Sequence, residues 1–191
     1  MAALIGWTRQ VPQVWKEIEC TGCYKVKEEY IRAKNDTIAD YYLKLYEWYT
    51  RKSRDYISIP EDAKYPIWFS LSEDFRLQKI QNTVILKVEI PEEEVLVIDM
   101  EKWDYRGNLM YVPKDQKDRE NFEKELKKYG IADETALAES AKGNHYPLLK
   151  RKIIDSWERL FTMPPESLEK GFATTWELKK EWVKEAEHCE S

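Results

Sequence analysis

The stretch "TVILKVEIPEEEVLVIDM", residues 83–100, decides the fold class of this chain. Apolar side chains alternate with others from Val84 to Ile90, which is the period of a β-strand. A Pro-Glu loop follows, and the apolar run 95–100 predicts a second strand. We expect the two strands to be antiparallel neighbours, with the more apolar second strand at the centre of a sheet.

Two further strands are predicted earlier in the chain. The run Leu4–Gln10 is one of them, and Pro12 after it is suited to begin a helix that Gly22 ends. The other is "YPIWFS", residues 65–70, where a proline between two aromatic residues favours a strand start at a sheet edge.

The clearest helix is predicted from Ile38 to Tyr49, because apolar residues recur there at spacings of four, three and four. Asn35 or Asp36 is expected to cap its first turn. Two more helices are predicted over residues 118–130 and 148–161.

Two segments are harder to assign. Residues 131–147 are expected to form a long irregular loop. The segment "GFATTWELKKEWVKEAEHC", residues 171–189, fits a strand and a capped helix almost equally, and we expect a strand that joins the sheet. The sequence therefore predicts an α+β fold, with a mixed, mostly antiparallel sheet flanked by helices, in a single domain over residues 1–191.

Composition limits the function. The chain has 191 residues, with 36 acidic against 31 basic side chains and a net charge of −5, which disfavours binding of nucleic acid through a broad basic face. We expect a cytoplasmic protein, because no signal segment or 18-residue apolar run is present. We also expect a monomer.

The cysteines do not predict a metal site. Cys20 and Cys23 form a CxxC pair, but a second pair of ligands is missing, since the only histidines are His145 and His188. We therefore expect reduced cysteines and no metal.

No P-loop, GxGxxG, HExxH or GxSxG motif is present, and four weaker patterns remain. In "GWTRQ", Arg9 at a strand end is suited to a phosphate or carboxylate and Trp7 to a planar ring; the alternative is a surface arginine beside a core tryptophan. In "YPIWFSLSEDFR", Ser70 and Ser72 share one side of an extended segment, with Arg76 after them. These hydroxyls suit a ribose or an amide, or they simply end an exposed strand.

The other two patterns offer groups for acid–base chemistry. Glu177 and Glu181 lie among aromatic residues, where a partly desolvated carboxylate acts on a sugar hydroxyl, although two surface glutamates are the plainer interpretation. His145 in "GNHYP" is either a general base or a solvated side chain.

Five motifs in order carry a resemblance: "GWTRQVPQVWKEIECTG", "YPIWFS", "IPEEEVLVIDMEKWDY", "KRKIIDSWERLF" and "ATTWELKKEWV". Together they resemble an uncharacterised family of small bacterial and phage proteins that open with a Trp-Thr-x-Gln strand and close on a Trp-Glu-Leu segment. The layout is similar to the ADP-ribosyltransferase superfamily, in which an opening strand bears Arg or His, a second strand an aromatic residue or serine, and a late strand a glutamate.

That resemblance implies NAD as substrate, transfer of ADP-ribose to a macromolecule, and no need for a metal. Thr8 or Arg9 takes the opening position. The second strand supplies Tyr65, Trp68 and Ser70, and Glu177 acts as the catalytic carboxylate. Trp7, Ser72 and Arg76 complete the expected NAD site. The late segment starts with "FATT" where the superfamily has an acidic residue.

The biological setting implied is a toxin, phage defence or anti-defence, with a protein or nucleic-acid target and a cognate partner or antitoxin. The alternative is a non-enzymatic interaction module or inhibitor on the same scaffold, to which the aromatic content is also suited.

Overall fold

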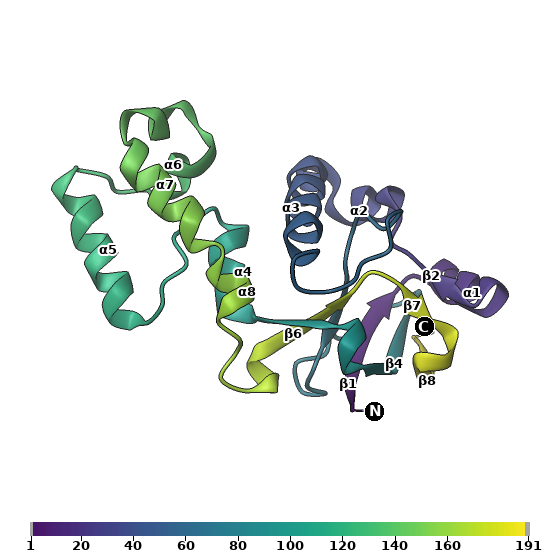
Figure 1. Ribbon diagram of the computed structural model, residues 1–191. Helices are drawn as coiled ribbons and strands as arrows, with labels where there is room; N and C mark the ends of the chain where they lie inside the picture. Colours follow the sequence, from purple (N-terminus) through teal and green to yellow (C-terminus); the bar gives the residue numbers. More distant parts are fainter. Residues whose placement is uncertain (1, 190–191) are drawn as a thin grey trace. The chain divides into compact units, whose positions relative to one another are not determined.

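The computed structural model describes residues 2–189 and divides the chain into two compact units. The first unit runs to Val97 and resumes at Ser167, and the second is Ile98–Glu166. Strands and three helices make up the first unit, and the second is mainly helical (Figure 1). No helix within residues 2–189 is both long and apolar enough to span a membrane.

A six-stranded sheet forms the first unit, in the order β5-β6-β3-β1-β4-β8. The registers of β1 with β3 and β4, of β3 with β6, and of β4 with β8 are all antiparallel. The strands are β1 (Ala3–Gln10), β3 (Ile67–Ser70), β4 (Thr83–Pro91), β5 (Leu96–Asp99), β6 (Gly171–Thr175) and β8 (Val183–Cys189), and a separate ribbon pairs β2 (Cys23–Tyr24) with β7 (Leu178–Lys179). The α+β class and the strand character of the last segment are confirmed.

The predicted pairing of the two strands in residues 83–100 is wrong. β4 pairs along its length with β1, from Ala3↔Pro91 to Gln10↔Val84, and β8 takes its other edge. The turn η2 (Glu92–Glu94) follows β4, and β5 joins the opposite end of the sheet beside β6. β4 is thus the interior strand, with Val84, Ile85 and Leu86 buried on both of its faces, and β5 is an edge strand.

Two helices cover opposite faces of this sheet. α1 (Pro12–Thr21) begins at Pro12, ends at Gly22 as predicted, and packs Val14 and Ile18 against a core that includes Phe69. Trp68 precedes Phe69 in β3, and side chains of consecutive strand residues point to opposite faces of a sheet. α3 (Ala39–Ser53) therefore packs on the other face, where its Tyr49 stacks on Trp68.

The start of α3 differs from the prediction. A separate helix, α2 (Glu28–Asn35), precedes it, followed by a 3₁₀ turn, η1 (Asp36–Ile38), so that α3 begins at Ala39. Neither Asn35 nor Asp36 caps α3. The Asn35 side chain instead donates to the carbonyl of Ile31, 2.9 Å away, within the last turn of α2.

The second unit contains five helices, which are α4 (Met100–Gly107), α5 (Gln116–Lys128), α6 (Thr135–Glu139), α7 (Pro147–Ser156) and α8 (Arg159–Thr162). The helix predicted at 118–130 is confirmed as α5, and Asp115 caps it. The helix predicted at 148–161 is two helices, α7 and α8. The helical segment is interrupted at Trp157, whose indole N–H donates to the carbonyl of Met110.

The predicted loop at 131–147 is also more regular than expected, since α6 and a 3₁₀ turn, η3 (Ala141–His145), lie within it. Buried polar groups organise the unit around them. Glu134 accepts the backbone N–H of Tyr111 and lies 2.6 Å from Arg119. These contacts of the buried Glu134 hold the segment 131–147 in the interior of the second unit.

Candidate functional site

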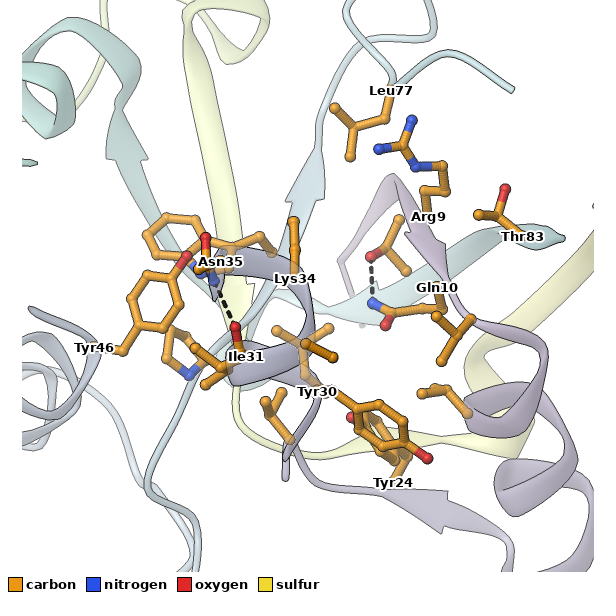
Figure 2. A pocket seen from close by; sticks show the side chains of 18 residues that line it. Arg9, Gln10, Tyr24, Tyr30, Ile31, Lys34, Asn35, Tyr46, Leu77 and Thr83 are labelled. Carbon is orange, nitrogen blue, oxygen red and sulfur yellow. Dashed lines mark hydrogen bonds between the residues drawn. The ribbon is translucent and has the colours of Figure 1, made fainter. Parts of the chain in front are cut away.

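The sheet of the first unit opens between β1 and β3. Their register is a single pair within the described chain, Trp7↔Ser70, although β1 continues to Gln10 beside β4. A cavity of about 360 Å³ lies where the two strands part, lined by the last residues of β1 and the first residues of β3 (Figure 2). Its volume lies within the range of about 300–1,000 Å³ typical of small-molecule sites.

Aromatic side chains form much of the cavity wall. Trp68 of β3 lies with its ring centre 5.9 Å from that of Tyr46 on α3, and Tyr24 and Tyr30 form a second pair. Burial raises the pKa of Tyr46 to about 12, with a smaller contribution from Tyr42, so the phenol stays neutral at physiological pH. Neutral aromatic walls of this kind suit a planar ring.

Two cations stand among the lining residues, Arg9 from β1 and Lys34 from α2 (Figure 2). The guanidinium of Arg9 donates to the carbonyl of Gln78 at 2.6 Å. The Lys34 side chain is exposed over much of its surface, and partial desolvation at the cavity lowers the pKa of its ammonium, with a smaller lowering by the charge of Arg9. Among the described residues the cavity lining includes two cations and no carboxylate, so its electrostatic character is positive.

The structure brings three of the predicted site residues together, because Thr8, Arg9 and Trp68 all line the cavity. Thr8 is buried and accepts a hydrogen bond from Gln10 at 2.8 Å. Trp7 and Ser70 are register partners at the point where β1 and β3 still touch, outside the lining.

The other predicted residues of the second strand satisfy local structure. The Ser70 hydroxyl donates to the carbonyl of Ser72 at 2.8 Å and so closes a turn after β3. Arg76 pairs with Glu73 at 3.4 Å. Tyr65 precedes β3, packs with Ile31 and Leu43, and does not line the cavity.

Glu177 lies in the turn between β6 and β7, two residues past the end of β6, the strand on which it was expected. It also lies 3.7 Å from the ammonium of Lys25, which binds Asp62 more closely, at 2.8 Å. The turn is nonetheless at the cavity end of the sheet. Thr175 pairs with Ile67 and Leu178 pairs with Tyr24, and both of these partners line the cavity.

The remaining acid–base candidates are exposed. Glu181 lies in the 3₁₀ turn η5 (Lys180–Trp182), and His145 ends η3 in the second unit. Among residues 2–189 no group of three His, Cys, Asp or Glu side chains is placed to hold a metal, and all three cysteines are unbridged.

Sequence reasoning missed the part of the site that α2 supplies. Tyr30 and Lys34 are one helical turn apart on that helix, and both line the cavity. The segment "EEYIRAKN" carries this spacing, but it has few apolar residues to mark it as a helix.

These observations define an α+β protein with an aromatic, positively charged cavity at a split in an antiparallel sheet. The chain belongs to the family described as Domain of unknown function (DUF3841), whose model matches residues 5–184. The expectation of an uncharacterised domain family is therefore confirmed. Neither the curated proteins nor the solved structures include a match to this chain.

Proposed function

We propose that this protein is an NAD-dependent ADP-ribosyltransferase-like enzyme that modifies a macromolecular target, and that the cavity between β1 and β3 takes the nicotinamide end of NAD. The observation that carries the proposal is the parting of β1 from β3 beside Arg9, where an aromatic cavity opens. The proposed setting is a toxin or a phage-defence protein with a cognate neutralising partner.

The strand order supports this proposal. The opening strand, the second strand and the late strand of the superfamily's layout correspond to β1, β3 and β6, which are far apart in sequence. In the sheet they are consecutive neighbours, in the order β6-β3-β1. Residues from all three strands, and Glu177 after β6, therefore gather at one end of the sheet.

The proposed chemistry breaks the bond between nicotinamide and ribose. As nicotinamide leaves with the bonding electrons, positive charge develops on the sugar. A nucleophilic group of the target then bonds to the same carbon and loses its proton to solvent. In this scheme Trp68 and Tyr46 hold the ring, Arg9 faces the pyrophosphate, and the carboxylate of Glu177 stabilises the sugar cation. Glu177 leaves Lys25 to do so, and Asp62 retains that lysine.

The size of the cavity constrains how NAD fits. A volume of about 360 Å³ is at the small end of the range for ligand sites, so it accommodates one ring and its ribose rather than a whole dinucleotide. The proposal accordingly places the pyrophosphate at the positively charged mouth.

The proposal is tested by incubating the protein with adenine-labelled NAD and cell extract. Wild type is expected to transfer label, and Glu177→Gln to bind NAD normally while transferring at least tenfold less, because the amide keeps the shape but loses the charge. Glu181→Gln is the matched control and is expected to act as wild type, since Glu181 is exposed in the same segment. Transfer by Glu177→Gln at the wild-type rate would contradict the catalytic role of Glu177.

One observation favours the non-enzymatic alternative. The loop after β3 exposes three large apolar side chains, Phe75, Leu77 and Ile80, each at least half accessible to solvent. Exposed apolar groups of this kind mark protein interaction sites when they form a patch. A protein that binds a partner without NAD chemistry would show no thermal stabilisation by millimolar NAD, whereas the enzyme proposal requires a rise in the melting midpoint.

A further inference from the structure

We infer that Lys34 of α2 and Arg9 of β1 together form a two-cation site at the cavity mouth that binds the phosphoryl groups of the ligand. The inference deepens the proposed function and rests on it for the identity of that ligand, a dinucleotide. It adds a residue from a helix that lies outside the three strands of the superfamily's layout.

The positions of the two cations come from different elements. Arg9 is the next-to-last residue of β1, at the part of that strand that has left β3. Lys34 is in the last turn of α2, and the Asn35 side chain closes that turn on the carbonyl of Ile31. Figure 2 shows both side chains among the residues around the cavity, with Leu77 beside Arg9.

Lys34 differs from its basic neighbours in lacking a counterion. Lys25 binds Asp62, Lys27 binds Glu17 at 2.6 Å, and Arg32 binds both Glu28 and Asp40. Within residues 2–189, no carboxylate lies in ion-pair distance of Lys34 or of Arg9. Lys34, which lines the cavity, thus has no carboxylate partner among these residues, whereas Lys25, Lys27 and Arg32 each form an ion pair.

Two like charges without a counterion repel each other, and an anion between them removes that cost. Both residues line the same cavity, and the pKa of the Lys34 ammonium is lowered by partial desolvation first and by the charge of Arg9 second. Arginine offers a planar fork of donors and lysine a compact charge, and both are common ligands of phosphate oxygens. A diphosphate carries oxygens on two phosphorus atoms, so that one phosphate group can bind the arginine while the other binds the lysine.

The test is calorimetric titration of the full chain with inorganic pyrophosphate and, separately, with nicotinamide. Lys34→Met is expected to weaken pyrophosphate binding at least tenfold and to leave nicotinamide binding unchanged. Lys44→Met is the matched control, since Lys44 is an exposed lysine on α3 that does not line the cavity. A circular dichroism spectrum equal to that of wild type shows that each variant is folded.

Unchanged pyrophosphate affinity in Lys34→Met would overturn the inference, and so would an equal loss in Lys44→Met, which would indicate nonspecific attraction. The outcome is separable from that of the proposed function. Loss of pyrophosphate binding in Lys34→Met, with no label transferred by wild type, supports the two-cation site and rejects the enzyme. Transfer of label by wild type, with pyrophosphate binding intact in Lys34→Met, supports the enzyme and rejects the two-cation site.

Discussion

At the scale of single residues, Arg9 has the most direct consequence for ligand binding. Within residues 2–189 its guanidinium donates to one carbonyl, that of Gln78, and the remaining donors of the fork are available to a ligand. We expect Arg9→Ala to weaken NAD binding by roughly 1.5–3 kcal/mol, the range for a lost hydrogen bond to a charged group. Arg76→Ala is the control in the same calorimetric measurement, because Arg76 pairs with Glu73 outside the cavity.

A core residue provides a contrasting prediction. Thr174 shares a buried hydrogen bond of 2.8 Å with the hydroxyl of Tyr49 and also donates to the carbonyl of Leu96. Thr174→Val keeps the shape but removes both bonds, so we expect the free energy of unfolding to fall by about 1–3 kcal/mol, as measured by urea titration. A variant as stable as wild type would show that these bonds contribute no net stability.

The sequence predicted part of the site at this scale. Arg9 was identified from its residue type and its place at a strand end, and Trp68 was identified from the family resemblance; both line the cavity. Ser70 and Ser72 were also identified, but a hydroxyl that follows a strand has a backbone acceptor within reach, and Ser70 uses it. Sequence position does not distinguish these two outcomes.

At the scale of secondary-structure elements, the end of α1 depends on the backbone conformation of Gly22. Gly22 ends this helix with φ of 87°, a left-handed conformation in which its N–H donates to the carbonyl of Ile18. We expect Gly22→Ala to lower the melting midpoint, at a cost of about 1 kcal/mol, since a Cβ is strained at positive φ.

The control for this substitution is Gly107→Ala. Gly107 is the last residue of α4, its φ is not positive, and an added Cβ meets no atom within 4 Å. Alanine is expected to be neutral or slightly stabilising there. Equal destabilisation by both substitutions would contradict a conformational role for Gly22.

Element types were easier to predict than their pairing. Alternation identified β4 and proline with glycine bounded α1, because both signals are local. The partner of β4 depended on β1 and β8, which are distant in sequence, and the chain after Pro91 carries no two-residue hairpin turn to hold β5 alongside. α2 was missed because its stability derives from packing by Ile31 and Tyr30 rather than from a strong apolar period.

At the scale of the whole molecule, the second unit has a network of polar side chains of its own, and Asp118, a partly exposed carboxylate on α5, connects several of them. This carboxylate accepts hydrogen bonds from the hydroxyl of Tyr111, the backbone of Lys114 and the guanidinium of Arg159. Burial alone raises the pKa of Asp118, but these bonds and the charge of Arg159 outweigh it, so that the pKa is lowered.

The lowered pKa predicts a loss of stability in acid. The stabilising contribution is complete above the unfolded-state pKa of about 3.9 and is lost as the pH falls through the lower folded-state pKa. We expect Asp118→Asn to reduce the free energy of unfolding at neutral pH by about 1–3 kcal/mol and to show a shallower decline below about pH 5 than wild type. Parallel declines in the two proteins, followed by circular dichroism, would contradict this assignment.

The central claim is that the cavity between β1 and β3 binds NAD, and calorimetric titration of the wild-type chain with NAD tests it most directly. We predict saturable binding at a one-to-one ratio, weakened by Arg9→Ala and unaffected by Arg76→Ala. Absence of heat at millimolar NAD, or binding that Arg9→Ala leaves unchanged, would contradict the claim.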